Sequence, residues 1–161
     1  LEVEGIWMPT SALTLRAALG TLDANYDSYD YAGRDIANVA QLLYAPELTW
    51  SIGAEHISQV FGGELILTAN YSFQDEVFTQ TPWAIYDPAT FPKITIDDWE
   101  SLDVSATYLR DTENGTFKVI LYGTDVLEDG NRVQRRYTTG SFTWAELAPR
   151  QQFGVTVGYE F

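Results

Sequence analysis

The chain has 161 residues, carries a net charge of −14 and contains no cysteine. The acidic charge excludes a nucleic-acid-binding protein, which needs clustered Lys and Arg to neutralise phosphates. The absence of cysteine excludes disulfides and thiolate metal sites. Hydrophobic residues at 45% and aromatic residues at 14% favour an ordered fold. We expect no membrane helix, because no run of about 18 apolar residues is present, and no signal peptide, because no basic segment followed by an apolar core opens the chain.

Two alternating runs at the start of the chain predict a hairpin. The first covers residues 1–7, with glutamates at positions 2 and 4 and mostly apolar residues at odd positions. The second covers residues 13–20, with Leu13, Leu15, Ala17 and Leu19 on one face. A period of two residues indicates a β-strand with one apolar and one polar face. Residues 8–12, which include Pro9 and small polar residues, suit a short turn between the two strands.

A long polar segment, residues 23–44, follows this hairpin and is predicted to be a loop that could hold a helical turn at 36–43. Ala45-Pro46-Glu47 ends the loop, and a third strand is predicted at 48–55. A short turn at 59–63 leads to the fourth strand, residues 64–74, in which only Ile66 breaks the alternation. The order is therefore strand, short turn, strand, long loop.

The same order continues to residue 161. A second long segment covers residues 76–98 and contains three prolines, which fit poorly inside a sheet. Strands are predicted at 102–108 and 117–124, joined by Asn114-Gly115, a dipeptide that favours the positive φ angles of a tight hairpin turn. A third long segment, 127–150, precedes the closing strand at 152–161, where an apolar or aromatic residue occupies every second position.

Alternating short turns and long loops are typical of outer-membrane β-barrels, whose periplasmic turns are short and whose extracellular loops are long. A strand of about ten residues also has the length that a tilted strand needs to cross a bilayer. We therefore predict an all-β fold, an antiparallel up-and-down transmembrane sheet of about seven strands with its C-terminus on the periplasmic side. An odd number of strands cannot close such a barrel, so the sheet alone should be open and curved.

The aromatic residues of the apolar face support this prediction, because Trp, Tyr and Phe gather at the two water interfaces of a membrane protein. At the short-turn end the expected girdle residues are Trp7, Tyr108, Phe117, Tyr159 and Phe161. At the long-loop end they are Trp50, Tyr71, Phe73 and Phe153. The exceptions are Trp99, which falls on the inward face of its strand, and Trp83 and Trp144, which fall in loops.

We expect no enzyme, no cofactor and no metal site. Glu2 and Glu4 share a strand face as catalytic carboxylates could, but no base, nucleophile or oxyanion device accompanies them. His56 is the only histidine, which excludes a site with several histidine ligands, and its parity places it outward near the short-turn end. Residues 125–130 faintly resemble a calcium loop, but Leu127 occupies a position that requires an Asp or Asn ligand.

Two groups of loop residues are candidate ligand-binding residues. The last loop gathers the basic residues Arg132, Arg135, Arg136 and Arg150 around Tyr137 and Trp144. Because arginine forks match carboxylate and phosphate oxygens, this group could capture an anionic ligand or lipopolysaccharide phosphates, although a solvated run of charges is the alternative. An aromatic group could line an extracellular vestibule or simply pack the loops, and it consists of Tyr26, Tyr29, Tyr31, Trp83 and Tyr86.

Four features, taken in order along the chain, are similar to those of a known family. They are the hairpin of residues 1–26 with its Met8-Pro9-Thr10 turn, the Ala45-Pro46-Glu47 lead into a strand, the sixth strand with its long following loop, and the closing Phe153-Gly154-Val155-Thr156-Val157-Gly158-Tyr159-Glu160-Phe161. Together they resemble the C-terminal part of the TonB-dependent receptors of Gram-negative bacteria, and the resemblance covers residues 1–161.

This resemblance implies that the chain supplies about the last seven strands of an outer-membrane barrel of about 22 strands, with the plug domain and earlier strands outside it. It implies active import of a scarce nutrient, above all a ferric siderophore, driven by the TonB energy-coupling complex acting on the plug. The implied further partners are outer-membrane lipid and lipopolysaccharide. The barrel-assembly machinery would recognise a C-terminal signal that contains Tyr159 and Phe161.

Two other interpretations stay open at this point. A passive outer-membrane pore or a small structural barrel would have the same kind of strands, although long loops favour a receptor. A soluble β-sandwich or lipocalin-like binding module would instead bury the outward Leu and Val residues in its core. The need for detergent separates the membrane interpretations from the soluble one.

Overall fold

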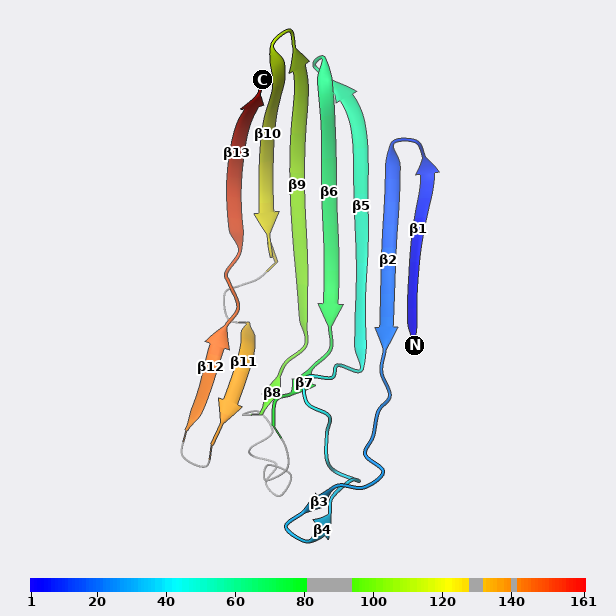
Figure 1. Cartoon of the computed structure of the whole chain (residues 1–161), viewed down its shortest axis with the longest axis vertical. Coiled ribbons are helices and arrows are strands. Elements are labelled where there is room, and N and C mark those ends of the chain that lie inside the picture. Colours follow the sequence, from blue (N-terminus) through cyan, green and yellow to red (C-terminus); the bar gives the residue numbers. More distant parts are fainter. Residues whose placement is uncertain (81–93, 128–131, 140–141) are drawn as a thin grey trace.

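The computed structural model describes residues 1–80, 94–127, 132–139 and 142–161. Within these residues, seven antiparallel strands form one open sheet in which each strand lies beside its neighbours along the chain (Figure 1). The strands are β1 (Glu2–Thr10), β2 (Leu13–Thr21), β5 (Leu48–Val60), β6 (Gly63–Gln74), β9 (Trp99–Thr112), β10 (Gly115–Thr124) and β13 (Gln152–Glu160). The prediction of an all-β meander with seven main strands is therefore confirmed.

The connections alternate in length as predicted. Two-residue turns join β1 to β2, β5 to β6 and β9 to β10, and all three lie at one end of the sheet (Figure 1). The described residues of the long connections, 22–47, 75–98 and 125–151, lie at the other end. The strands β5 and β9 are longer than predicted, because hairpin pairing continues beyond their alternating residues, whereas β6 agrees with the prediction to within one residue.

The register of the sheet places the predicted apolar positions on one face. Residues directly opposite each other in an antiparallel pair share a face, and one such row runs through Val3, Leu19, Trp50 and Phe73. A second row runs through Leu67, Ala106, Leu121 and Val155. Because no register shift occurs between β2 and β13, the two faces stay distinct across the sheet.

Apolar side chains on this face remain exposed among the described residues. Ile52 is 55% exposed, Leu121 51% and Val157 63%. On β9 the apolar stretch ends in a charge at both sides, since Glu100 lies opposite Phe73 and Arg110 lies opposite Phe117. The hydroxyl of Tyr71 donates a hydrogen bond to the Glu100 carboxylate.

The short turns differ in how they are built. In the first, the Oγ1 atom of Thr10 accepts hydrogen bonds from the backbone N–H groups of Ala12 and Leu13, at 3.2 and 3.1 Å. In the second, Phe61 and Gly62 have φ angles of 50° and 74°, which is the left-handed pair that a two-residue hairpin turn prefers. The third hairpin was expected to use positive φ angles at both Asn114 and Gly115. Of these two residues only Gly115 has a positive φ, because the central turn residues are Glu113 and Asn114.

The long connections contain short hairpins that the sequence did not predict. They are β3 (Asp30–Tyr31) with β4 (Arg34–Asp35), β7 (Val77–Phe78) with β8 (Thr95–Ile96), and β11 (Val133–Thr138) with β12 (Thr143–Leu147). The buried apolar residues of the described chain all lie in these connections, and they are Ile36, Ala40, Val77, Ile94, Ile96 and Ala148. The hydrophobic core thus sits beyond the end of the sheet.

The helical turn considered for residues 36–43 is reduced to a single turn. The backbone oxygen of Ile36 accepts hydrogen bonds from the N–H groups of Val39 and Ala40, at 3.0 and 2.9 Å, and the described residues form no helix. Accordingly, none of the described residues belong to a helix of the length and hydropathy that a membrane crossing requires.

Candidate functional site

A cavity of about 350 Å³ lies where the polar face of the sheet meets the loop hairpins. Four chain segments build it, since its wall consists of Tyr44, Gln74, Val77, Ile96, Trp99, Arg132, Val133 and Gln134. Gln74 and Trp99 lie opposite each other in the register of β6 and β9, so the sheet supplies one wall and the loops supply the others. The volume and the mixture of apolar side chains with a few polar groups are typical of small-molecule sites.

Trp99 is the residue that joins the sheet to the last loop. Its inward position was predicted as an exception to the aromatic pattern, and its pairing with Gln74 confirms that it faces the polar side. The guanidinium carbon of Arg132 lies 4.6 Å from the centre of the Trp99 ring. A cation over an indole ring is stabilised by the ring quadrupole, so Trp99 holds the start of β11 against the sheet.

An ion pair fixes the other side of Arg132. Its Nη2 atom lies 2.8 Å from Oδ2 of Asp125, and the two side chains are only 20% and 11% exposed. The backbone N–H of Asp125 in turn donates to Oδ1 of Asp103 at 2.7 Å, and Asp125 has a φ of 53°. The carboxylates of Asp103 and Asp125 therefore connect β9 and the end of β10 to the loop hairpin, and they neutralise Arg132 locally.

The remaining arginines of the predicted basic group do not converge on one point. Nη1 of Arg135 lies 3.6 Å from Oε2 of Glu146 in an exposed ion pair, because the two residues are opposite each other in the hairpin of β11 and β12. Arg136 is half-buried in the same hairpin, and Arg150 is exposed before β13. Tyr137 and Trp144 face each other across the hairpin, and both are about half exposed.

The predicted aromatic group is brought together only in part. The rings of Tyr26 and Tyr29 pack edge to face, with their centres 4.9 Å apart. Tyr31 is exposed in β3, and Trp83 and Tyr86 lie outside the described residues. The loop that carries these tyrosines is held by Asp35, whose Oδ1 accepts hydrogen bonds from the N–H groups of Tyr29 and Ala37 at 3.0 and 2.9 Å. These bonds stabilise the carboxylate and keep the pKa of Asp35 below its ordinary value.

A second, smaller cavity of about 230 Å³ lies between the first and second long connections. Its wall is mainly polar and includes the four carboxylates of Asp23, Glu47, Asp75 and Glu76. Despite this acidity, the described residues contain no group of three or more His, Cys, Asp or Glu side chains with the geometry of a metal site. The cavity therefore gathers negative charge between the two connections.

The aromatic residues predicted for the two girdles lie at the two ends of the apolar face. At the loop end Trp50 stacks on Tyr71 and Phe73, with ring centres 5.2 and 5.9 Å apart. At the turn end, Phe117 lies opposite Tyr159, and the Tyr159 and Phe161 rings pack edge to face at 5.4 Å. Trp7, Tyr108 and Phe153 also lie toward the ends of their strands.

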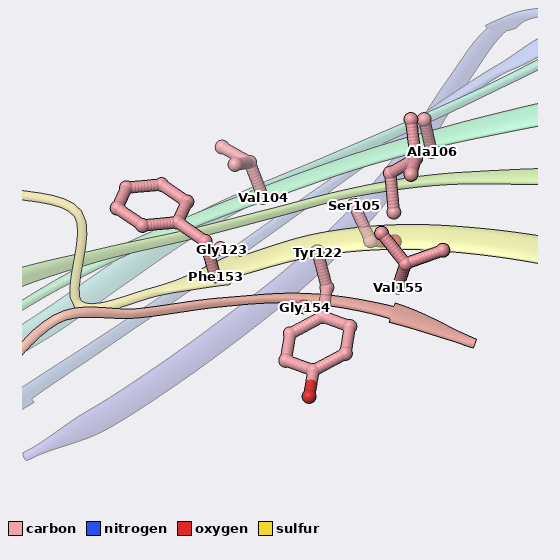
Figure 2. A pocket seen from close by; sticks show the side chains of 9 residues that line it. Val104, Ser105, Ala106, Tyr122, Gly123, Phe153, Gly154 and Val155 are labelled. Atoms are coloured by element: carbon pink, nitrogen blue, oxygen red, sulfur yellow. The ribbon is translucent and has the colours of Figure 1, made fainter.

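A shallow groove of about 530 Å³ on the apolar face runs along β9, β10 and β13. Figure 2 shows Phe153, Val104 and Ala106 on one side of these strands and the ring of Tyr122 on the other side. Gly123 packs closely against its neighbours, since a Cβ atom there would lie 2.7 Å from Cγ1 of Val126 and 2.9 Å from the Phe153 ring. Its wall contains no charged residue and is mainly apolar, with the hydroxyls of Ser105 and Tyr122 as its polar side-chain groups.

The sequence indicates the loop arginines but not the other residues that line the 350 Å³ cavity. Tyr44, Gln74 and Gln134 carry no motif, and Asp103 and Asp125 were not recognised as partners of the basic group. One signal was available in the sequence. Trp99 breaks the parity of its strand, and an inward tryptophan at the end of a strand indicates that other residues pack against it. Glu2 and Glu4 lie exposed on the polar face of β1.

Comparison of the chain with protein-family models, curated proteins and solved structures finds no match.

Proposed function

We propose that this chain forms the C-terminal part of the barrel wall of a TonB-dependent outer-membrane receptor that imports a scarce nutrient, above all a ferric siderophore. The observation that carries the proposal is the register of the seven-stranded sheet. It keeps an exposed apolar face continuous from β1 to β13, with aromatic rings at both ends and short turns at one end only. A lipid-facing barrel wall has these properties.

The alternative of a soluble sandwich would require a second layer on the apolar face. The described residues leave Leu121 and Val157 more than half exposed on that face, while the loop hairpins lie beyond the end of the sheet (Figure 1). Burying such side chains contributes roughly 1.5 to 3 kcal/mol each, so an uncovered face of this size favours contact with hydrocarbon. In the proposed barrel, lipid covers the apolar side chains of this face.

In this proposal the polar face lines the barrel lumen and the long loops face the outside of the cell. The 350 Å³ cavity beside Trp99 and Arg132 then lies at the extracellular end of the lumen, where an incoming ligand would bind first. The chain's own residues perform no covalent chemistry. The TonB complex would act through a plug domain that is not part of this chain, and lipopolysaccharide would surround the loop end.

The edges of the sheet also support a larger barrel. Among the described residues β1 and β13 each have a neighbouring strand on one side only, and unpaired backbone groups at an edge are costly in hydrocarbon. Seven antiparallel strands cannot close on themselves, because the first and last would run parallel. Additional strands of the receptor would pair with both edges.

The test uses two neighbouring residues of β13 in the full-length receptor. Val157 lies on the apolar face opposite Val119, and Thr156 lies on the polar face opposite Ile120. Val157→Arg should destabilise the membrane-inserted barrel by roughly 2 to 4 kcal/mol if it lies near the bilayer centre, whereas Thr156→Arg should be tolerated. Folded barrel is measured by urea titration in lipid vesicles, and equal effects of the two substitutions would contradict the assigned faces.

Transport is tested separately from membrane insertion. Membrane fractionation should recover the native protein in the outer membrane, and its purification should need detergent. A protein that stays monodisperse in plain buffer would contradict the membrane proposal. Uptake that persists after the proton gradient is collapsed would instead indicate a passive pore.

A further inference from the structure

The apolar face of the sheet carries very few charged side chains. In the seven main strands, all of whose residues are described, the register places only Glu100 and Arg110 on this face among all Asp, Glu, Lys and Arg residues. Charged residues of the neighbouring strands, such as Glu64 and Lys118, fall on the polar face. Arg110 is therefore the one basic side chain that these strands present on the apolar face.

Arg110 lies at the turn end of β9, opposite Phe117, and its side chain is exposed. Among the described residues, no side chain forms an ion pair or a hydrogen bond with its guanidinium group. Glu100 at the loop end differs, because its carboxylate accepts a hydrogen bond from Tyr71. The five N–H donors of Arg110 are thus available to an acceptor from outside the chain.

Aromatic side chains surround this end of the apolar face, and hydrogen bonds hold two of their rings in place. The hydroxyl of Tyr108 donates to the backbone oxygen of Phe61 at 3.1 Å, and the hydroxyl of Tyr159 lies 2.9 Å from Oγ1 of Thr112. The side chain of Phe61, in the turn between β5 and β6, is 91% exposed. Within this aromatic patch Arg110 is the cationic group.

The carboxylates closest in sequence to Arg110 do not share its face. Asp111 lies on the polar face, where Oγ1 of Thr116 donates a hydrogen bond to its Oδ1 at 2.8 Å. Glu113 is a central residue of the turn between β9 and β10. An anion that approaches from the apolar side would therefore meet the guanidinium of Arg110 without a carboxylate on the same face of β9 at this end.

The depth of Arg110 in the proposed barrel indicates which anion it would meet. An arginine on the lipid face is costly at the bilayer centre and nearly neutral close to the interface, and its long side chain can extend to the level of the lipid headgroups. Aromatic rings at the same end of the face also favour this level. The anionic group found there is the phosphate of a glycerophospholipid, whose oxygens match a guanidinium fork.

We propose that Arg110 binds the phosphate of an anionic glycerophospholipid in the leaflet at the turn end. This inference rests on the membrane part of the proposed function. The acyl chains of the lipid would lie along the apolar rows of β10 and β13, where Val119 is opposite Val157. An anionic headgroup is preferred over a zwitterionic one, because the ammonium group of a zwitterionic headgroup would be repelled by the guanidinium.

Lipid binding to the purified full-length protein tests the inference. The protein is delipidated in detergent and incubated with phosphatidylglycerol or phosphatidylethanolamine that carry the same acyl chains, and bound lipid is counted by native mass spectrometry. Phosphatidylglycerol should bind about fivefold more tightly, which is the attraction expected from one basic residue near an anionic lipid. Equal or weaker binding of phosphatidylglycerol would overturn the proposed preference.

Three variants assign the effect to Arg110. Arg110→Gln should weaken phosphatidylglycerol binding about fivefold and change phosphatidylethanolamine binding less, whereas Arg110→Lys should retain most of the preference because it keeps the charge. Lys118→Gln is the matched control, since it removes a basic residue from the polar face of the adjacent strand, and it should change neither affinity. Equal losses in Arg110→Gln and Lys118→Gln, or in Arg110→Gln and Arg110→Lys, would contradict the proposed site.

The outcomes separate this inference from the function on which it rests. Circular dichroism first establishes that each variant is folded, which we expect because Arg110 has no partner among the described side chains. A folded outer-membrane protein whose lipid binding is the same with Arg110 and with Gln at this position keeps the proposed function and loses the inference. A protein that fractionates away from the outer membrane and needs no detergent overturns the proposed function itself.

Discussion

The seven-stranded sheet and the loop end, which is formed by the described residues of the three long connections, differ in how far their apolar side chains are exposed. On the sheet Ile52 is 55% exposed and Val155 is 65% exposed, although both belong to a continuous apolar face. At the loop end Ile94 is 2% exposed and Ile36 is 4% exposed, although neither belongs to a regular pattern. The loop end thus has a hydrophobic core of its own, whereas the described residues leave the apolar face of the sheet exposed.

Comparing isoleucines from the two regions gives the largest expected effect. Ile94→Ala should destabilise the loop end by about 2 to 5 kcal/mol, because it leaves a cavity in a packed core. The change should appear as faster hydrogen exchange at residues 77–79 and 94–96 in the full-length protein. Ile52→Ala is the matched control, and in detergent or lipid it should change protection of the loop end very little. Similar effects of the two substitutions on the loop end would contradict the separation of the two regions.

Removing the ion pair between Asp125 and Arg132, which connects the sheet to the loop end, should cause the next largest loss of stability. Asp125→Asn keeps a side chain that tolerates a φ of 53° but removes the charge opposite Arg132. Because the pair is mostly buried, we expect a loss of about 1 to 3 kcal/mol, measured as faster exchange in β11 and β12 with unchanged exchange in β9. Glu146→Gln removes the exposed pair with Arg135 and should cost less than about 1 kcal/mol. A larger effect of Glu146→Gln would contradict this ranking.

Two glycines of the same strand test packing on the polar face of the sheet. A Cβ atom at Gly154 would overlap the Tyr122 ring, whereas a Cβ atom at Gly158 would meet no atom within 4 Å. Gly154→Ala should therefore displace Tyr122 and destabilise the sheet by about 1 kcal/mol. Gly158→Ala should be neutral or slightly stabilising, because alanine restricts the unfolded chain more than glycine does. Urea titration in lipid vesicles measures both, and a reversed order would show that Tyr122 does not cover Gly154.

The smallest effect concerns the loop that carries the tyrosines. Folding lowers the pKa of Asp35 below its ordinary value of 3.8, through hydrogen bonds from Tyr29 and Ala37. The charged form is therefore favoured in the fold, so this stabilisation is present above pH about 3.8 and is lost as the pH falls through the lowered pKa. The protection factors of the Tyr29 and Ala37 amides, which correct for the pH dependence of intrinsic exchange, should be high at pH 5 and fall at lower pH. In Asp35→Asn the exchange should lose this acid dependence.

The strands of the sheet could be predicted because each one shows an alternating pattern within a few consecutive residues. A strand with one apolar face must alternate, so the pattern Phe153, Val155, Val157 and Tyr159 predicts both the strand and its outward face. The loop hairpins were not predictable in this way. Strands of two residues such as β3 and β7 are too short to show a period, and they are held by contacts between distant segments, such as the hydrogen bond from the N–H of Thr79 to the oxygen of Ile94 at 2.7 Å.

The candidate site was predictable by residue type but not by arrangement. The cluster of arginines in the last loop was evident in the sequence, yet nothing in it indicates that Asp125 pairs with Arg132 while Glu146 pairs with Arg135. These partners depend on the positive φ of Asp125 and on the register of β11 with β12. The positive charge that the loop offers to a ligand is therefore smaller than its number of arginines suggests.

In the proposed barrel, the charged residues that end the apolar stretch of β9 would limit the thickness of the bilayer that this strand can cross. Glu100 and Arg110 are ten residues apart along an extended strand, which corresponds to about 33 Å. A tilt of about 40° projects this length onto roughly 25 Å along the membrane normal, the height of the apolar band in outer-membrane barrels. In the proposed barrel a thicker bilayer would draw Glu100 or Arg110 into hydrocarbon, so the wall is matched to a thin membrane such as the bacterial outer membrane.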